Sequence, residues 1–154
     1  MDMADIIHAK TGLSLADLMA MGSDARVEII DGELVEMAAG GHVNGIIGAN
    51  CIRLLGNYLE EKPIGVVMQD ATTYLMFSNQ RRLRDSFVPD VSFIFHENVP
   101  PDWDPTSMLH PGVPDLAIEI VSPTDNPDEV LRKRQIYLQK GTREVWILYP
   151  GAEE

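Results

Sequence analysis

Apolar residues recur along the chain with two different spacings, and each spacing predicts a different kind of element. Over residues 43–61 they return every three or four positions, which predicts an amphipathic helix. Asn126 is a favoured helix cap, and the pattern after it predicts a second helix over residues 127–140. Ser14 stands three residues before Asp17, a spacing typical of a capping box, so we expect a short helix to begin there.

Shorter apolar runs, rich in β-branched and aromatic residues, predict strands between the helices. Polarity alternates around Asp31-Gly32, which indicates a hairpin over residues 26–37. Further strands are expected over residues 64–69, 72–77, 87–95, 116–121 and 144–149. Residues 98–113 are polar and rich in proline, and are expected to form a long surface loop.

This order of elements predicts a single α/β domain over residues 1–154. The expected core is a helix, three strands, a second helix and a last strand, preceded by an N-terminal helix and the hairpin. We expect the strands to form a central mixed sheet flanked by helices.

The charge of the chain bears on the class of function. The formal net charge is −12 at pH 7, which argues against broad electrostatic attraction to DNA. One dense basic cluster remains, formed by Arg81, Arg82 and Arg84. We interpret this cluster either as a solvated loop or as a local contact for nucleic acid.

Composition also indicates the cellular compartment. Cys51 is the only cysteine, so neither an intrachain disulfide nor a zinc site with several cysteine ligands is possible. No apolar run approaches the ~20 residues of a membrane helix. The N-terminus is acidic where a signal peptide is basic. We therefore expect a cytoplasmic protein with no membrane partner.

Two acidic residues stand inside runs that are otherwise apolar: Asp90 in residues 87–95 and Glu119 in residues 116–121. A carboxylate buried without a partner costs several kcal/mol, and two on neighbouring strands repel each other unless a cation lies between them. Mg²⁺ prefers carboxylate oxygens and water, so the pair predicts a metal site and metal-assisted hydrolysis of a phosphate ester. Asp115 is the alternative to Asp90, but it lies about 13 Å from Glu119 along one strand.

The third expected member of the site is a cation that orients the attacking water. Lys133 lies between Val130 and Tyr137 on the inward stripe of the second helix. Its amine is expected either to meet a carboxylate or to extend to solvent. His42, at the start of the long helix, and Glu36, beside the hairpin, are candidate accessory residues.

Several of these segments together resemble a known family. The similar segments are residues 27–37, 88–93, 114–123 and 141–147, with His42, Lys133 and Tyr137. They resemble the Uma-type family of bacterial restriction endonuclease-like proteins, within the PD-(D/E)XK nuclease-like superfamily. The resemblance implies a restriction-endonuclease-like α-β-β-β-α-β core, and Asp90 and Glu119 as ligands of Mg²⁺ or Mn²⁺. It also implies that the catalytic lysine of the strand has moved to Lys133 on the helix.

We therefore predict a Mg²⁺-dependent endonuclease that hydrolyses DNA phosphodiester bonds and assembles as a homodimer. Its expected catalytic residues are Asp90, Glu119 and Lys133. One alternative is a nuclease fold that is kept as a binding or assembly module, without turnover. Two features favour it: the net charge of −12, and Val121 at the strand position where the superfamily has its lysine. The other alternative is a metal-dependent hydrolase of a small phosphorylated molecule, which suits an acidic surface.

Overall fold

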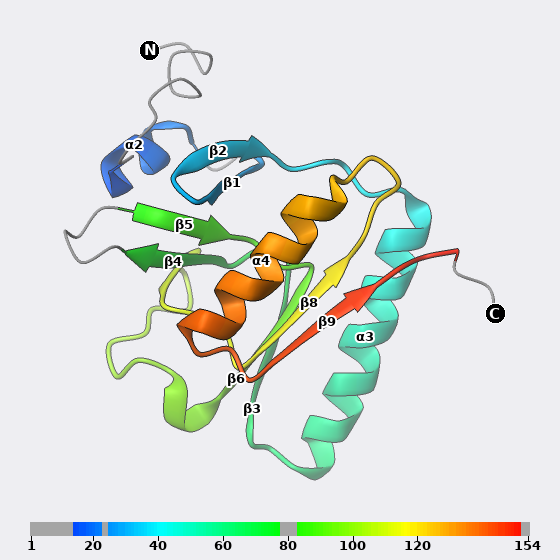
Figure 1. Ribbon diagram of the computed structural model, residues 1–154. Coiled ribbons are helices and arrows are strands. Elements are labelled where there is room, and N and C mark those ends of the chain that lie inside the picture. Colours follow the sequence, from blue (N-terminus) through cyan, green and yellow to red (C-terminus); the bar gives the residue numbers. More distant parts are fainter. Residues whose placement is uncertain (1–13, 23–24, 78–82, 152–154) are drawn as a thin grey trace.

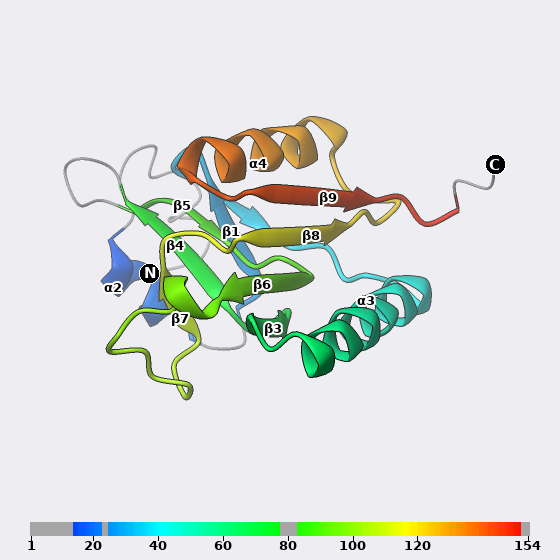
Figure 2. The same cartoon turned by 90° about the horizontal axis from the view of Figure 1, so that it is seen from below.

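The computed structural model describes residues 14–22, 25–77 and 83–151. Within them, the strands form two sheets, and helices cover both faces of one sheet (Figures 1 and 2). The helices are α2 (Leu15–Ala20), α3 (His42–Glu61) and α4 (Pro127–Lys140), with a 3-10 turn, η1, at His96–Asn98. The strands are β1 (Val27–Ile30), β2 (Glu33–Glu36), β3 (Gly65–Gln69), β4 (Thr73–Phe77), β5 (Leu83–Phe87), β6 (Val91–Phe95), β7 (Leu109–Pro111), β8 (Leu116–Ile120) and β9 (Glu144–Leu148).

The two sheets meet beside α4. The first sheet has the strand order β2-β1-β5-β4-β7, and the second has the order β3-β6-β8-β9. Neighbouring strands are antiparallel, except that β7 runs parallel to β4 and β9 runs parallel to β8. The second sheet lies between α3 on one face and α4 on the other, as Figure 2 shows. Because α4 also contacts β1, it packs against both sheets.

Two apolar clusters hold these layers together. On the α4 side, Ile136 and Tyr137 pack with Phe87 of the first sheet and Ala117 of the second. On the other face, α3 packs onto the second sheet through its inward apolar residues, which are Ile47, Cys51, Ile52, Leu55 and Leu59. Each large apolar side chain that is fully buried contributes about 1.5–3 kcal/mol. The clusters therefore hold α4 and α3 on opposite faces of the second sheet.

The local features predicted for helix ends and the hairpin are confirmed. Ser14 and Asp17 form a capping box at the start of α2, and the Asn126 side chain caps α4. Gly141 ends α4 with φ of 111°, a backbone conformation that strongly favours glycine. The Asp31-Gly32 turn joins the antiparallel pair β1 and β2.

The prediction of one strand over residues 87–95 is wrong. β5 ends at Phe87 in the first sheet, and β6 begins at Val91 in the second, so residues 88–90 cross between the sheets. Pro89 has no N–H to donate to a ladder, which favours a break at this point. The strands are thus divided between two mixed sheets, and Asp90 lies immediately before β6 instead of inside a strand.

Residues 98–113 also differ from a simple loop. Leu109–Pro111 forms β7, which extends the first sheet beside β4. His110 within it is buried and stacks edge-on against Tyr74. Among the helices of the described residues, none has the length and apolar character to span a membrane.

Candidate functional site

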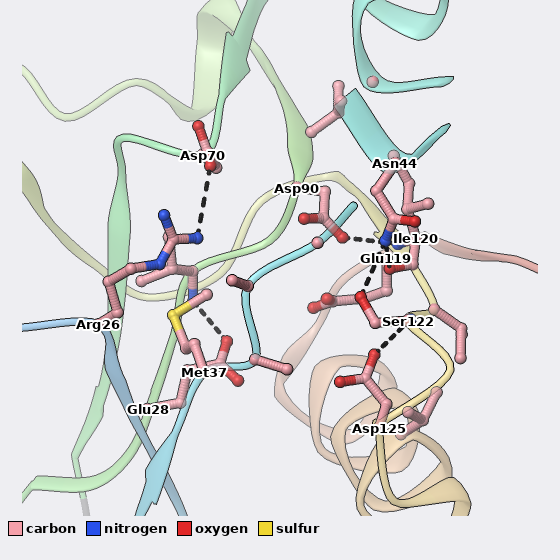
Figure 3. A pocket seen from close by; sticks show the side chains of 18 of the residues that line it. Arg26, Glu28, Met37, Asn44, Asp70, Asp90, Glu119, Ile120, Ser122 and Asp125 are labelled. Atoms are coloured by element: carbon pink, nitrogen blue, oxygen red, sulfur yellow. Dashed lines mark hydrogen bonds and ion pairs between the residues drawn. The ribbon is translucent and has the colours of Figure 1, made fainter. Parts of the chain in front are cut away.

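A cavity of about 610 Å³ lies where β1, the end of β8 and the starts of α3 and α4 come together. Figure 3 shows Arg26 and Asp70 on one side of it and Asn44 on the other. The side chains of Asp90 and Glu119 both point into this cavity (Figure 3). The fold thus brings together the two carboxylates that the sequence singled out.

The crossing between the sheets places Asp90 beside the end of β8. The Oδ2 atom of Asp90 accepts a hydrogen bond of 2.6 Å from the backbone N–H of Ile120, the residue after Glu119. Burial raises the pKa of the Asp90 carboxyl, and the Ile120 N–H acts against that rise because it stabilises the charged form. The strand that carries Glu119 therefore also holds Asp90 in place.

Glu119 takes its polar side-chain contacts from α4. Its Oε1 atom accepts a hydrogen bond of 3.0 Å from the Tyr137 hydroxyl and lies 2.8 Å from Nζ of Lys133. Burial raises the pKa of Glu119 to about 7; the Lys133 ammonium acts against the rise, and the carboxylates of Glu28 and Asp90 add to it. Glu119 is thus a carboxyl group whose charge depends on the cations around it.

Lys133 lies on the inward stripe of α4, with 10% of its side chain exposed. Its Nζ atom lies 2.8 Å from Oε1 of Glu119 and 2.9 Å from Oε1 of Glu28. Burial alone would lower the pKa of Lys133, but the two carboxylates outweigh it and raise the pKa above its usual value. Of the two orientations expected for this amine, the structure has the one directed at a carboxylate.

Glu28 is a member of the cluster that sequence reasoning missed. It lies in β1, whose four residues are all buried, and its own exposure is 6%. Its Oε1 atom accepts hydrogen bonds from the Lys133 ammonium at 2.9 Å and from the Val88 N–H at 2.8 Å. A glutamate between Val27 and Ile29 is the same signal, an acid inside an apolar run, that identified Asp90 and Glu119.

Asn44, in the first turns of α3, is a second residue that the sequence did not single out. Its Nδ2 atom donates to the Ile120 carbonyl at 3.1 Å and to the Ser122 hydroxyl at 3.0 Å. The side chain therefore ties the start of α3 to the end of β8, one residue beyond Glu119. Asp115, the rejected alternative, accepts the Phe95 N–H at 2.8 Å and does not line the cavity.

The accessory candidates lie further out. Glu36 is exposed and lines the cavity, whereas His42 is exposed in the first turn of α3 and is not part of the lining. Arg84 forms an ion pair of 3.4 Å with Asp31, away from the carboxylates. The other two members of the basic cluster, Arg81 and Arg82, lie outside the residues that the structure describes.

The cluster has the composition of a cation site. The single ammonium of Lys133 faces three carboxylates, those of Glu28, Asp90 and Glu119, so negative charge is in excess. Within the described chain, Oδ1 of Asp90 and Oε2 of Glu119 accept no hydrogen bond, which leaves both free for a ligand. Among the described residues, no group of three or more His, Cys, Asp or Glu side chains is placed so that all of them could hold one metal ion. A divalent cation that takes two carboxylates and several waters, as Mg²⁺ commonly does, fits this donor set.

Comparison with known proteins agrees with the predicted class of fold. A family model named Uma2, with the description "Putative restriction endonuclease", matches residues 14–154. The crystal structure of "a putative nuclease belonging to DUF820" from Anabaena variabilis superimposes with a TM-score of 0.75 at 19% identity, covering 90% of this chain and 74% of that one. A search of curated proteins returned no match.

The structural match confirms the predicted restriction-endonuclease-like α/β fold. The family model covers nearly the whole chain, and the chain belongs to the Uma2 family, as the resemblance in sequence predicted. Membership of this family supports a nuclease function, that is, hydrolysis of phosphodiester bonds.

Proposed function

We propose that this protein is an endonuclease that uses Mg²⁺ or Mn²⁺ to hydrolyse phosphodiester bonds in DNA. The observation that carries the proposal is the convergence of Asp90, Glu119 and Lys133 on one cavity. The family assignment supports the same chemistry.

Asp90 and Glu119 are the residues that would hold the metal, through the oxygens that accept no hydrogen bond from the protein. A bound divalent ion would supply positive charge to stabilise the phosphate oxygens during hydrolysis. The Ile120 N–H and the Tyr137 hydroxyl keep the two carboxylates in place. This arrangement confines the ligand oxygens to one side of the cavity.

Lys133 contributes a fixed positive charge beside the metal ligands. An ammonium has three N–H donors, and two of them are directed at Glu28 and Glu119. The third remains available to a water or a phosphate oxygen in the cavity that Lys133 lines. Because its pKa is raised, the side chain orients that group as a charged donor and does not act as a base at neutral pH.

A second candidate is a metal-dependent hydrolase of a small phosphorylated molecule. It is favoured by the size of the cavity, about 610 Å³, which lies in the range of pockets that hold small molecules. A net charge of −12 likewise offers DNA little general attraction. Such a substrate would need only the groups inside the cavity.

Plasmid DNA with Mn²⁺ or Mg²⁺ tests the first candidate. Wild type should nick or cut the plasmid, and Asp90→Asn and Glu119→Gln should each lose that activity. Glu61→Gln, which changes an exposed carboxylate at the far end of α3, should cut like wild type. A wild type that binds metal by calorimetry but cleaves only small phosphate esters would establish the second candidate. Metal binding without any turnover would favour a binding or assembly module.

A further inference from the structure

We propose that Glu28 is a positioning residue of this site, which fixes the Lys133 ammonium beside Glu119. Through the same oxygen, Glu28 also fixes the chain segment that leads into Asp90. The inference rests on the proposed function for its effect on turnover. Its effect on the position of Lys133 is independent of any activity.

The burial of Glu28 requires a specific partner for its charge. β1 lies between β2 and β5 in the first sheet, and all of its residues are buried. A carboxylate in such a place costs several kcal/mol unless it is paired and hydrogen-bonded. The only ion pair that Glu28 forms among the described residues is the one with Lys133, at 2.9 Å.

Two carboxylates restrict the lysine far more than one would. The side chain of lysine is a flexible four-carbon chain, and an ammonium bound on one side can still swing about that contact. In this site, Glu28 from the first sheet and Glu119 from the second bind Nζ of Lys133 at 2.9 Å and 2.8 Å. The amine is therefore fixed between the sheets, and its remaining N–H has a defined direction.

The second donor to Glu28 extends its role to the metal ligand. The Val88 N–H donates to Oε1 of Glu28 at 2.8 Å, two residues before Asp90. Residues 88–90 cross between the sheets and have no ladder partner of their own to set their position. Glu28 thus links the lysine to the segment that presents Asp90.

A second ion pair, separate from Glu28, also joins the hairpin to α4. Arg132, the neighbour of Lys133, binds both carboxylate oxygens of Asp31 at 2.6 Å and 2.7 Å, at the turn of the same hairpin. A change at Glu28 that keeps its shape should therefore leave the hairpin docked. The variant can therefore distinguish a displaced Lys133 ammonium from an unfolded protein.

Glu28→Gln is the variant that tests the proposal. An amide oxygen can still accept the Val88 N–H, but the negative charge that attracts Lys133 is gone. With Mn²⁺ and DNA, we expect kcat to fall at least tenfold, which corresponds to at least about 1.4 kcal/mol. KM and the metal affinity measured by calorimetry should stay within about twofold of wild type, a change of at most about 0.4 kcal/mol. Glu33→Gln, in the exposed part of β2, is the matched control and should retain activity. Equal kcat in Glu28→Gln and wild type would overturn the proposal.

A double-mutant cycle shows whether Glu28 acts through the lysine. In a Lys133→Gln background, Glu28→Gln should add little further loss of kcat, because the group that it positions is already absent. Independent, additive losses would show that Glu28 does not act through Lys133.

The third measurement needs no turnover. In ¹⁵N-labelled wild type, the ammonium of Lys133 should give a protected NMR signal that Lys133→Gln removes. In Glu28→Gln that signal should shift and exchange faster with water, and an unchanged signal would refute the proposed positioning. If wild type proved inactive on DNA, the proposed function would fail, while the ammonium signal would still decide the role of Glu28.

Discussion

Replacement of Lys133 by alanine tests the charge balance of the cavity most directly. The ammonium lies 2.9 Å from an oxygen of Glu28 and 2.8 Å from an oxygen of Glu119. In Lys133→Ala these two buried carboxylates would share one cavity without their cation. Loss of one partner of a buried ion pair costs about 3–5 kcal/mol. Since domains are stable by only about 5–15 kcal/mol, the variant should be severely destabilised at neutral pH and above.

The pH dependence of the stability lost in Lys133→Ala gives a second, independent test. Glu119 can relieve the repulsion by taking up a proton, and its pKa is already raised to about 7 in the wild type. The loss should therefore be largest near pH 8 and smaller near pH 5. Lys133 itself adds no pH dependence in this range, because its raised pKa means that its contribution is lost only in alkaline solution, above its usual value of 10.5.

Urea denaturation in chelator at pH 5 and pH 8 measures both effects. Arg134→Ala is the matched control, since Arg134 is an exposed cation next to Lys133 on the same helix. It should cost less than about 1 kcal/mol at either pH, as exposed charges usually do. A loss of that small size in Lys133→Ala, or an equal loss at both pH values, would refute the reasoning about buried charge.

Two further predictions follow from the same carboxylates. Without metal, the stability of the wild type should fall as pH rises from about 4.5 to about 7, because the raised pKa of Glu119 makes the folded state bind more protons than the unfolded state in this window. Urea midpoints measured across it should vary less in Glu119→Gln. Mg²⁺ or Mn²⁺ should raise the melting temperature of the wild type by binding the folded state. Asp90→Asn should abolish that shift, and a shift of the same size in this variant would contradict the role of Asp90 as a ligand.

Local patterns in the sequence predicted the helices and the two central carboxylates. The caps at Ser14 and Asn126 and the end of α4 at Gly141 depend on a few neighbouring residues, so they follow from spacing alone. Asp90 and Glu119 stood out because an acid in an apolar run needs a partner. The inward position of Lys133 on α4 was predicted as well, but the spacing left two orientations of its amine open, and only the contacts with Glu28 and Glu119 decide between them.

What the sequence did not predict depends on contacts between distant segments. The break at Pro89 moves the chain from one sheet to the other, and no local pattern states which strands will then be neighbours. Glu28 was overlooked although it stands between Val27 and Ile29, where an acid in an apolar run is a local signal. Its burial depends on α4, which packs against β1 only in the folded molecule. His42 was selected for its chemistry at a helix start, yet the first turn of α3 leaves it exposed.

The ion pair between Glu28 and Lys133 joins positions 105 residues apart, and this separation bears on the order of folding. During synthesis the hairpin emerges long before the lysine that neutralises its buried glutamate. Contacts of such long range slow folding, because closing a long loop costs chain entropy before the contact can form. Until α4 docks, Glu28 and Glu119 lack their shared cation. Docking of α4 therefore supplies the cation of the site, and chains that stop before it would expose the sheet surface on which α4 packs.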